Sequence, residues 1–276
     1  MDSRERYCVN QDPTEIIPNI RHFALDMDGT VYLEETWIDG ALDFFRRVEE
    51  TGRSYCFMTN NSSKDRDTYA EKLRRMGLEV KPETQIITSG HATIAYLKKH
   101  YSNKRVFLLG NPLLTAEFEA EGVWLDDQDP EVVVSSFDTT LTYKKLRLFC
   151  DFVREGRPYL ATHPDYNCLT ATGTGIIPDI GATHAYVEAS TGRMPDRIMG
   201  KPNREIVDYM LEVTRAERRE TAVVGDRLYT DIKCGAGNGL YSIFVLSGEA
   251  QLKDLPNSEV QPDLIFDSLK ELIPLL

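Results

Sequence analysis

Short apolar runs alternate along the chain with stretches in which apolar residues recur every three or four positions. The runs predict strands buried on both faces, and the periodic stretches predict helices. The predicted strands are Arg21–Leu25, Ser54–Met58, Gln85–Thr88, Arg105–Leu109, Glu131–Ser135, Pro158–Ala161, Thr221–Val224, Tyr241–Leu246 and Leu264–Phe266. The predicted helices are Gly40–Thr51, Lys64–Met76, Ser89–His100, Leu113–Glu121, Thr142–Glu155, Thr183–Thr191, Asn203–Thr214, a short helix closed by Gly235–Gly239, and Ser268–Leu272. This alternation predicts an α/β fold with a parallel sheet.

Polar side chains follow several predicted strands at the point where each strand ends. Asp26 and Asp28 come directly after the first strand. The other members of this set are Thr59, Asn60, Lys201, Asp226 and Asp231. The carboxyl ends of parallel strands meet at one edge of a sheet, so these side chains can share one site. Carboxylates can hold Mg2+, a hydroxyl and a lysine can bind phosphate oxygens, and an aspartate can act as nucleophile. This set of side chains is therefore suited to the transfer of a phosphoryl group to a carboxylate.

Taken singly, each of these residues has a simpler interpretation. Asp28-Gly29 occurs in many hairpin turns, Asp226 can be an ordinary turn residue, and Lys201 can be a solvated loop lysine. Asn60 can be a helix-capping loop residue. Their order along the chain favours the common site over four separate coincidences.

Composition narrows the classes of partner and location. The 276 residues carry a net charge of −12, which argues against a nucleic-acid partner. No apolar run approaches the ~18 residues that a membrane span needs. Five widely spaced cysteines without a C-x-x-C pair, and a polar N-terminus, predict a reduced protein in the cytoplasm. Residues 1–20, with Pro13 and Pro18, predict a loosely held lead-in.

Four motifs in this order resemble the haloacid dehalogenase (HAD) superfamily of phosphatases. They are D-x-D-G-T at Asp26–Thr30, an apolar strand ending in Thr59, Lys201, and G-D-x-x-x-x-D at Gly225–Asp231. The sequences FMTNNSS, GKPN and GDRLYTDI are similar to the NagD-type, p-nitrophenylphosphatase-like subgroup, subfamily IIA. The resemblance extends over nearly the whole chain from about residue 20. It implies a Rossmann-like core that carries a second domain.

Motif spacing predicts where that second domain is inserted. Asp26 and Thr59 are 33 residues apart, enough for one strand–helix–strand step. Thr59 and Lys201 are 142 residues apart, far more than the crossovers between them require. The excess, 83–198, is expected to be an inserted α/β domain of the type C2 cap, which selects the substrate. The catalytic core is then discontinuous and consists of 1–82 and 199–276.

The resemblance also implies a role for each motif residue. Asp26 would attack phosphorus and become an aspartyl phosphate, while Asp28 would act first as acid and then as base. Mg2+ would be held by the Asp26 carboxylate, the Asp28 backbone carbonyl and the Asp226 carboxylate. Asp231 would support the metal indirectly, through water or through hydrogen bonds to its ligands. Thr59 and Asn60 would bind the transferring phosphoryl group. Lys201 would neutralise charge on Asp26 and the phosphate together.

Three residues of the insert, in the segment ATHPDYNC, are possible substrate contacts. These are His163, Asp165 and Asn167. The alternative is a structural turn in which Asp165 is hydrogen-bonded internally.

These features predict a Mg2+-dependent phosphomonoester hydrolase for a small phosphorylated metabolite, with p-nitrophenyl phosphate as a generic substrate. One alternative is a phosphotransferase or phosphomutase that uses the same aspartyl phosphate. The other is a non-enzymatic binder of phosphate ligands. A homodimer is implied by the resemblance alone.

Overall fold

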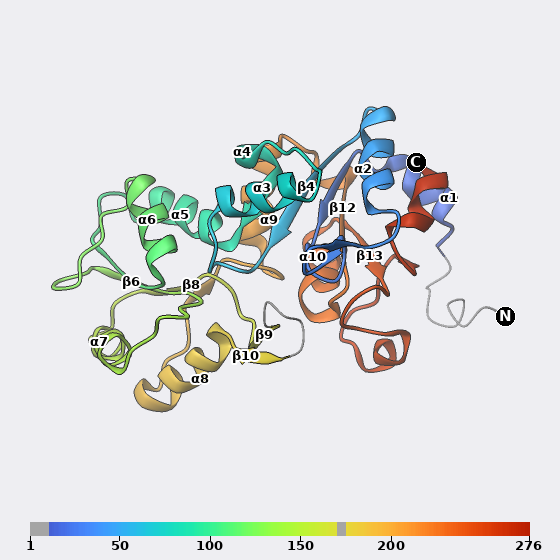
Figure 1. Ribbon diagram of the computed structural model, residues 1–276. Helices are drawn as coiled ribbons and strands as arrows, with labels where there is room; N and C mark the ends of the chain where they lie inside the picture. The colour runs from blue at the N-terminus through green and yellow to red at the C-terminus, as the bar shows by residue number, and fades with distance from the viewer. Residues whose placement is uncertain (1–10, 170–174) are drawn as a thin grey trace. The chain divides into compact units, whose positions relative to one another are not determined.

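The computed structural model describes residues 11–169 and 175–276 (Figure 1). The chain folds as two compact units. Among the described residues, the first contains 11–59, Ala70–Ile87 and Lys201–Leu276, and the second contains Asn60–Tyr69 and Thr88–Gly200. The assignment of a catalytic core and a substrate-selecting cap stays a prediction, and the segment 60–69 belongs to the same compact unit as 88–200.

A six-stranded sheet forms the centre of the first unit. Its strand order is β14-β13-β12-β1-β4-β5. The strands are β1 (His22–Leu25), β4 (Ser54–Thr59), β5 (Ile86–Thr88), β12 (Thr221–Gly225), β13 (Tyr241–Val245) and β14 (Leu264–Phe266). β1 pairs in parallel with both β12 and β4, and β12 is buried throughout. The predicted α/β fold with a parallel sheet is confirmed. The carboxyl ends of β1, β4 and β12 consequently lie at the same sheet edge.

Helices and short turns complete the first unit. They are α1 (Pro13–Ile16), η1 (Ile17–Asn19), α2 (Ala41–Glu50), α4 (Pro82–Gln85), α9 (Arg204–Thr214), η2 (Arg218–Glu220), η3 (Leu228–Ile232), α10 (Lys233–Asn238), η4 (Leu252–Asn257) and η5 (Leu269–Leu275). A further helix, α3 (Arg66–Arg75), is divided between the two units after Tyr69. α2 buries Ala41, Phe44, Phe45 and Val48, the helical spacing expected of a core-facing stripe. Figure 1 shows α2 beside the C-terminal segment, which it contacts through η5. A two-residue hairpin, β2 (Tyr32–Leu33) with β3 (Thr36–Trp37), was not predicted.

Two sequence predictions in this unit are wrong in detail. Within residues 11–20, Ile16, Ile17 and Ile20 are buried, so this part of the chain is anchored in the core. The segment predicted as helix 268–272 is the 3-10 helix η5, which contains Pro274 and therefore lacks one backbone donor. The predicted short helix closed by Gly235–Gly239 is α10, which runs through Asn238 and ends at Gly239 in the left-handed conformation. A residue larger than Gly235 would crowd β13, because an added Cβ would lie only 2.9 Å from Ser242 Cβ.

The second unit is built on its own four-stranded parallel sheet. The strand order is β11-β8-β7-β6, with β6 (Val106–Leu109), β7 (Val132–Ser135), β8 (Tyr159–Ala161) and β11 (Arg197–Ile198). Its helices are α5 (Ser89–His100), α6 (Pro112–Ala120), α7 (Tyr143–Arg154) and α8 (Ile180–Thr191). In Figure 1, α5 and α6 cover one face of this sheet, and α7 and α8 cover the other. An antiparallel pair, β9 (Asn167–Leu169) and β10 (Ile176–Pro178), was not predicted and precedes α8.

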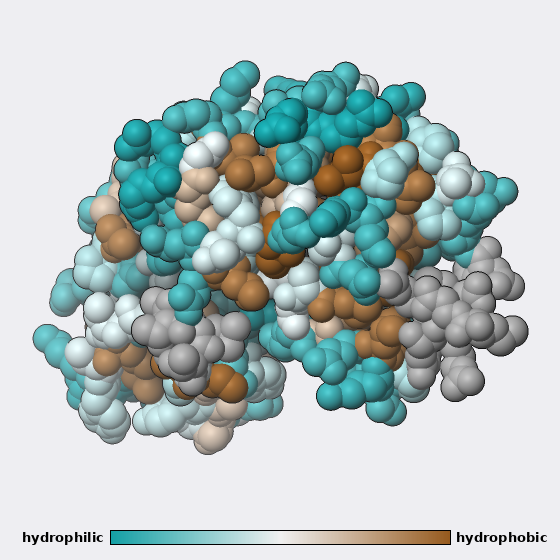
Figure 2. All heavy atoms as spheres, turned by 45° about the vertical axis from the view of Figure 1, so that its right-hand side comes forward, coloured by the Kyte–Doolittle hydropathy of each residue, from teal (hydrophilic) through white to brown (hydrophobic). Residues whose placement is uncertain are grey.

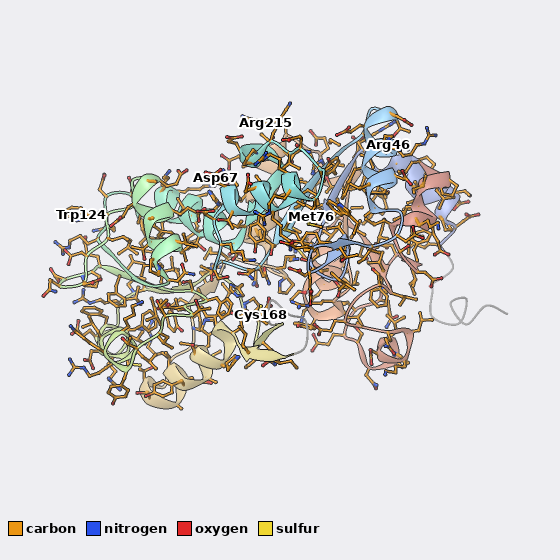
Figure 3. All side chains as sticks on the ribbon, in the orientation of Figure 1. Arg46, Asp67, Met76, Trp124, Cys168 and Arg215 are labelled. Carbon is orange, nitrogen blue, oxygen red and sulfur yellow. The ribbon has the colours of Figure 1, made fainter. Side chains whose placement is uncertain are left out.

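Each unit contains one of the two tryptophans of the chain. Trp37 packs edge-on against Tyr32 and Phe45, and its Nε1 donates to the carbonyl of Met76 at 2.7 Å. Trp124 is 58% exposed; Figure 3 labels both Trp124 and Met76.

On the face drawn in Figure 2, hydrophilic residues predominate and apolar residues occur in separate patches. No helix within 11–169 or 175–276 is long and apolar enough to cross a membrane.

The described cysteines are all free thiols, as the sequence predicts: Cys56, Cys150, Cys168 and Cys234. Cys8 lies outside the described residues.

Candidate active site

The strand register brings the predicted site residues of the first unit to one sheet edge. Leu25 of β1 is level with Val224 of β12 and Phe57 of β4. Asp26 follows directly, and its backbone N–H donates to the carbonyl of Val224 at 2.9 Å. Thr59 ends β4 two residues beyond Phe57, and it is 7% exposed. These largely apolar strands therefore end in polar side chains at one edge of the sheet.

Three carboxylates gather at this edge. One oxygen from each of Asp26, Asp226 and Asp231 lies within 4.8 Å of the others. Burial raises the pKa of Asp226, and the neighbouring Asp26 charge raises it further. Burial also raises the pKa of Asp231, although the Lys201 ammonium opposes that shift. Carboxylates held this close repel one another, so the arrangement needs positive charge.

Lys201 supplies part of that charge. Its Nζ lies 2.6 Å from Asp26 Oδ1 and 2.6 Å from Asp231 Oδ1, and the residue is 2% exposed. Burial would lower the pKa of Lys201, but the Asp231 and Asp26 carboxylates outweigh burial and raise it. The three carboxylates still outnumber the Lys201 ammonium and the nearby Arg227 guanidinium, which lowers the pKa of Asp226, so the cluster stays negative. Its oxygen donors and remaining charge fit a hard divalent cation such as Mg2+.

Asp226 is oriented by two donors that the sequence analysis missed. Thr30 Oγ1 donates to Asp226 Oδ1 at 3.0 Å, and the Glu249 backbone N–H donates to Asp226 Oδ2 at 2.7 Å. Thr30 belongs to the D-x-D-G-T motif, so its position was available as a signal. The loop Ser247–Glu249 follows β13 at the same sheet edge, and the same strand-end rule would have pointed to it.

Replacing Gly248 with alanine is expected to disturb this site. A Cβ at Gly248 would lie 2.0 Å from Asp226 Oδ2, so the carboxylate or the loop must move. We expect kcat/KM to fall at least about 10-fold, and the free energy of unfolding to fall by about 1–3 kcal/mol, as for overpacking in a core. Steady-state kinetics and thermal melting measure both effects.

Gly237→Ala is the matched control, because nothing lies within 4 Å of its added Cβ and the residue is inside α10. It should leave kcat/KM unchanged and stabilise the helix by about 0.5–1 kcal/mol. Equal kinetics for the two variants would contradict the proposed crowding of Asp226.

Asp28 lies apart from the three clustered carboxylates. It is exposed, and its backbone forms an isolated bridge with Tyr32. Its predicted contribution to a metal site is the backbone carbonyl, which does not require the side chain to join the cluster. An exposed carboxyl can instead exchange protons with solvent or substrate.

Asn60 and the predicted residues of the insert belong to the second unit. Asn60 Nδ2 lies 3.2 Å from both carboxylate oxygens of Asp165. His163 is fully buried, with Nε2 3.0 Å from Asp179 Oδ1 and Nδ1 2.9 Å from Thr162 Oγ1. Asn167 is exposed on β9. The structure thus joins Asn60 to Asp165, and it joins His163 to Asp179, a residue that the sequence analysis did not single out.

Comparison with known proteins identifies relatives over most of the chain. Residues 23–124 match the haloacid dehalogenase-like hydrolase family, and 198–272 match a HAD-hydrolase-like family. An acid sugar phosphatase of Staphylococcus aureus is 35% identical over 252 residues, which cover 91% of this chain and 96% of that protein. A 4-nitrophenylphosphatase from Thermotoga maritima superposes with a TM-score of 0.90 at 44% identity, covering 94% of this chain and 98% of the other. For NagD from Escherichia coli K-12, the TM-score is 0.83 at 29% identity, with 91% and 98% covered.

Proposed function

Since the chain belongs to the haloacid dehalogenase-like hydrolase family, we propose that this phosphatase hydrolyses small phosphate monoesters with Mg2+, through an aspartyl phosphate on Asp26. One observation carries the proposal. Asp26 stands at the carboxyl end of β1, bonded to Lys201 at 2.6 Å and clustered with Asp226 and Asp231. That arrangement places a nucleophile beside a fixed cation and a group of oxygen donors suited to a metal.

Asp26 is the nucleophile in this proposal. Its carboxylate oxygen forms a bond to phosphorus while the bond between phosphorus and the ester oxygen breaks. Asp28 gives a proton to the departing alkoxide, and it later takes a proton from the water that attacks the aspartyl phosphate. The exposure of Asp28 supports this role, because the carboxyl must exchange protons in every turnover.

The remaining residues hold charge where it accumulates. Lys201 bonds to Asp26 before attack and stays close to it when the phosphoryl group arrives. Thr59 and Asn60 donate to the phosphoryl oxygens. Asp26, Asp226 and the Asp28 carbonyl would hold Mg2+, and Asp231, already bonded to Lys201, would support them. When bound, the metal supplies positive charge to the phosphoryl oxygens and offsets the repulsion among the carboxylates.

The names of the relatives suggest where to look for substrates. They include acid sugar phosphatases and 4-nitrophenylphosphatases, so sugar phosphates and p-nitrophenyl phosphate are proposed substrates of this chain as well. The cytoplasmic location and the homodimer stay predictions.

The test is a panel of phosphate monoesters assayed on the purified protein with Mg2+ and with a chelator. We expect release of inorganic phosphate from p-nitrophenyl phosphate and from at least one sugar phosphate, and we expect loss of both activities with chelator. Adding an acceptor alcohol distinguishes hydrolysis from transfer, because a phosphotransferase would form a new ester instead of inorganic phosphate. Binding of phosphate esters without any turnover would contradict the proposal and favour the non-enzymatic binder.

A further inference from the structure

Four polar side chains form a continuous hydrogen-bonded chain in the interior of the second unit. Ser62, Thr162, His163 and Asp179 are each at most 5% exposed. Ser62 Oγ lies 3.3 Å from Thr162 Oγ1, which lies 2.9 Å from His163 Nδ1. His163 Nε2 lies 3.0 Å from Asp179 Oδ1. The chain thus links the segment that follows β4 to the first residues of α8.

The donors and acceptors available fix the direction of every hydrogen bond in this series of side chains. The Asp179 carboxylate can only accept, and it already accepts from the Ile180 N–H at 2.6 Å, so His163 Nε2 must donate to it. In the neutral ring Nδ1 then accepts from the Thr162 hydroxyl. Ser62 in turn donates to Thr162, and it accepts from the Phe137 N–H at 3.2 Å. Asp179 therefore fixes the tautomer and the orientation of His163.

Backbone hydrogen bonds connect this set of side chains to Asp165. The Gly181 N–H donates to the Asp165 carbonyl at 2.8 Å, and the Asp179 N–H donates to the Tyr166 carbonyl at 2.9 Å. The Asp165 carboxylate, 4% exposed, accepts from Asn60 Nδ2. Asn60 is itself held by its carbonyl, which accepts from Ser89 Oγ at 2.6 Å. The orientation of the Asn60 carboxamide thus depends on residues more than one hundred positions away.

We infer that Asp179 is a positioning residue: its carboxylate holds His163 and its backbone N–H holds Tyr166, so it fixes the segment 163–166, whose Asp165 sets the orientation of the Asn60 carboxamide. His163 is then part of this hydrogen-bonded series and does not bind substrate, because both its ring nitrogens are hydrogen-bonded within the second unit. The inference rests on the proposed function, which assigns Asn60 to the phosphoryl group. It adds a determinant of phosphate affinity that lies outside the four motifs.

A double-mutant cycle with p-nitrophenyl phosphate tests this inference. Asp179→Ser keeps a helix-capping side chain but is too short to reach His163, whereas Asp179→Asn keeps both the cap and an acceptor. We expect Asp179→Ser to lower kcat/KM on the order of 10-fold, and Asp179→Asn to stay within about 3-fold of the wild type. In an Asn60→Ala background, Asp179→Ser should change kcat/KM by less than about 2-fold, because its effect passes through Asn60.

His184→Gln is the matched control, since this buried histidine lies on the same helix and bonds to Ser135 instead. His184→Gln should lower the melting temperature, and any change it makes in kcat/KM should be the same in the wild-type and Asn60→Ala backgrounds. If Asp179→Ser does not fold, His163→Leu and His163→Gln replace it, because glutamine keeps a donor for Asp179 and should retain activity that leucine loses. Equal effects of Asp179→Ser in both backgrounds, or none, would overturn the inference.

The cycle also separates this inference from the proposed function. An Asn60→Ala variant as active as the wild type would remove the role of Asn60 and with it the target of Asp179, while the proposed hydrolysis through Asp26 would stand. A wild-type protein that releases no phosphate would contradict the phosphatase proposal first.

Discussion

Asp26→Asn should abolish turnover, with kcat reduced on the order of 10⁴-fold or more, because a carboxamide cannot form the aspartyl phosphate. The fold should persist, since asparagine has nearly the same shape and Lys201 keeps its bond to Asp231. Initial rates with p-nitrophenyl phosphate and saturating Mg2+ measure the loss, and thermal melting checks the fold.

Asp43→Asn provides the control for Asp26→Asn. Asp43 lies on α2, its side chain is 65% exposed, and it forms an ion pair with its helical neighbour Arg46 at 2.9 Å. This variant should keep wild-type kcat, because surface pairs of this kind contribute about 0–1 kcal/mol to stability. Full activity of Asp26→Asn would show that another group attacks phosphorus.

Removing the buried ammonium should have the second-largest effect. Lys201→Met leaves Asp26 and Asp231 without their 2.6 Å partner in a site shielded from water. We expect the free energy of unfolding to drop by about 3–5 kcal/mol, as when one member of a buried ion pair is deleted. We expect kcat to fall about 10²–10³-fold, the usual cost of removing one group that stabilises charge in the transition state. Lys98→Met, at a half-exposed ion pair with Glu121, should change neither quantity appreciably.

The stability loss in Lys201→Met should depend on pH. Burial already raises the pKa of Asp226 to about 6 and that of Asp231 to about 7, so the folded state binds protons more tightly than the unfolded state between about pH 4 and pH 7. Raising the pH through this window therefore destabilises the metal-free fold, and more so without Lys201. The difference in melting temperature between wild type and variant should be larger at pH 8 than at pH 5. A difference that shrinks with rising pH would contradict this account of the cluster.

The sequence predicted the sheet edge well, because the strands that build it are continuous apolar runs with polar ends. Residues 21–25 and 221–224 were predicted as strands, and β1 and β12 agree within one residue at each end. The site at their ends followed from a rule about parallel sheets rather than from any single residue. The comparisons confirm the family, whereas the roles of Asp26 and Lys201 stay predictions.

Other features escaped prediction because their causes are not local. Asp231 was predicted in the site, but its 2.6 Å contact with Lys201 was not, because it depends on the π-helical turn Leu228–Ile232, a geometry with no periodic signature in sequence. The Asp179–His163 contact joins residues 16 positions apart through the start of α8, which the pattern placed three residues too late. The hairpin β9–β10 is short and carries no clear alternation of apolar and polar residues.

The distribution of the two indoles gives each compact unit its own intrinsic fluorophore. Trp37 is half-buried, packed against aromatic rings with its Nε1 bonded to the Met76 carbonyl, so its emission reports on a more apolar setting than that of Trp124. Trp124 is largely in water, so its emission is red-shifted and open to soluble quenchers. With phenylalanine at one position or the other, unfolding of the sheet that carries Asp26 can be followed separately from unfolding of the unit that carries Asp179.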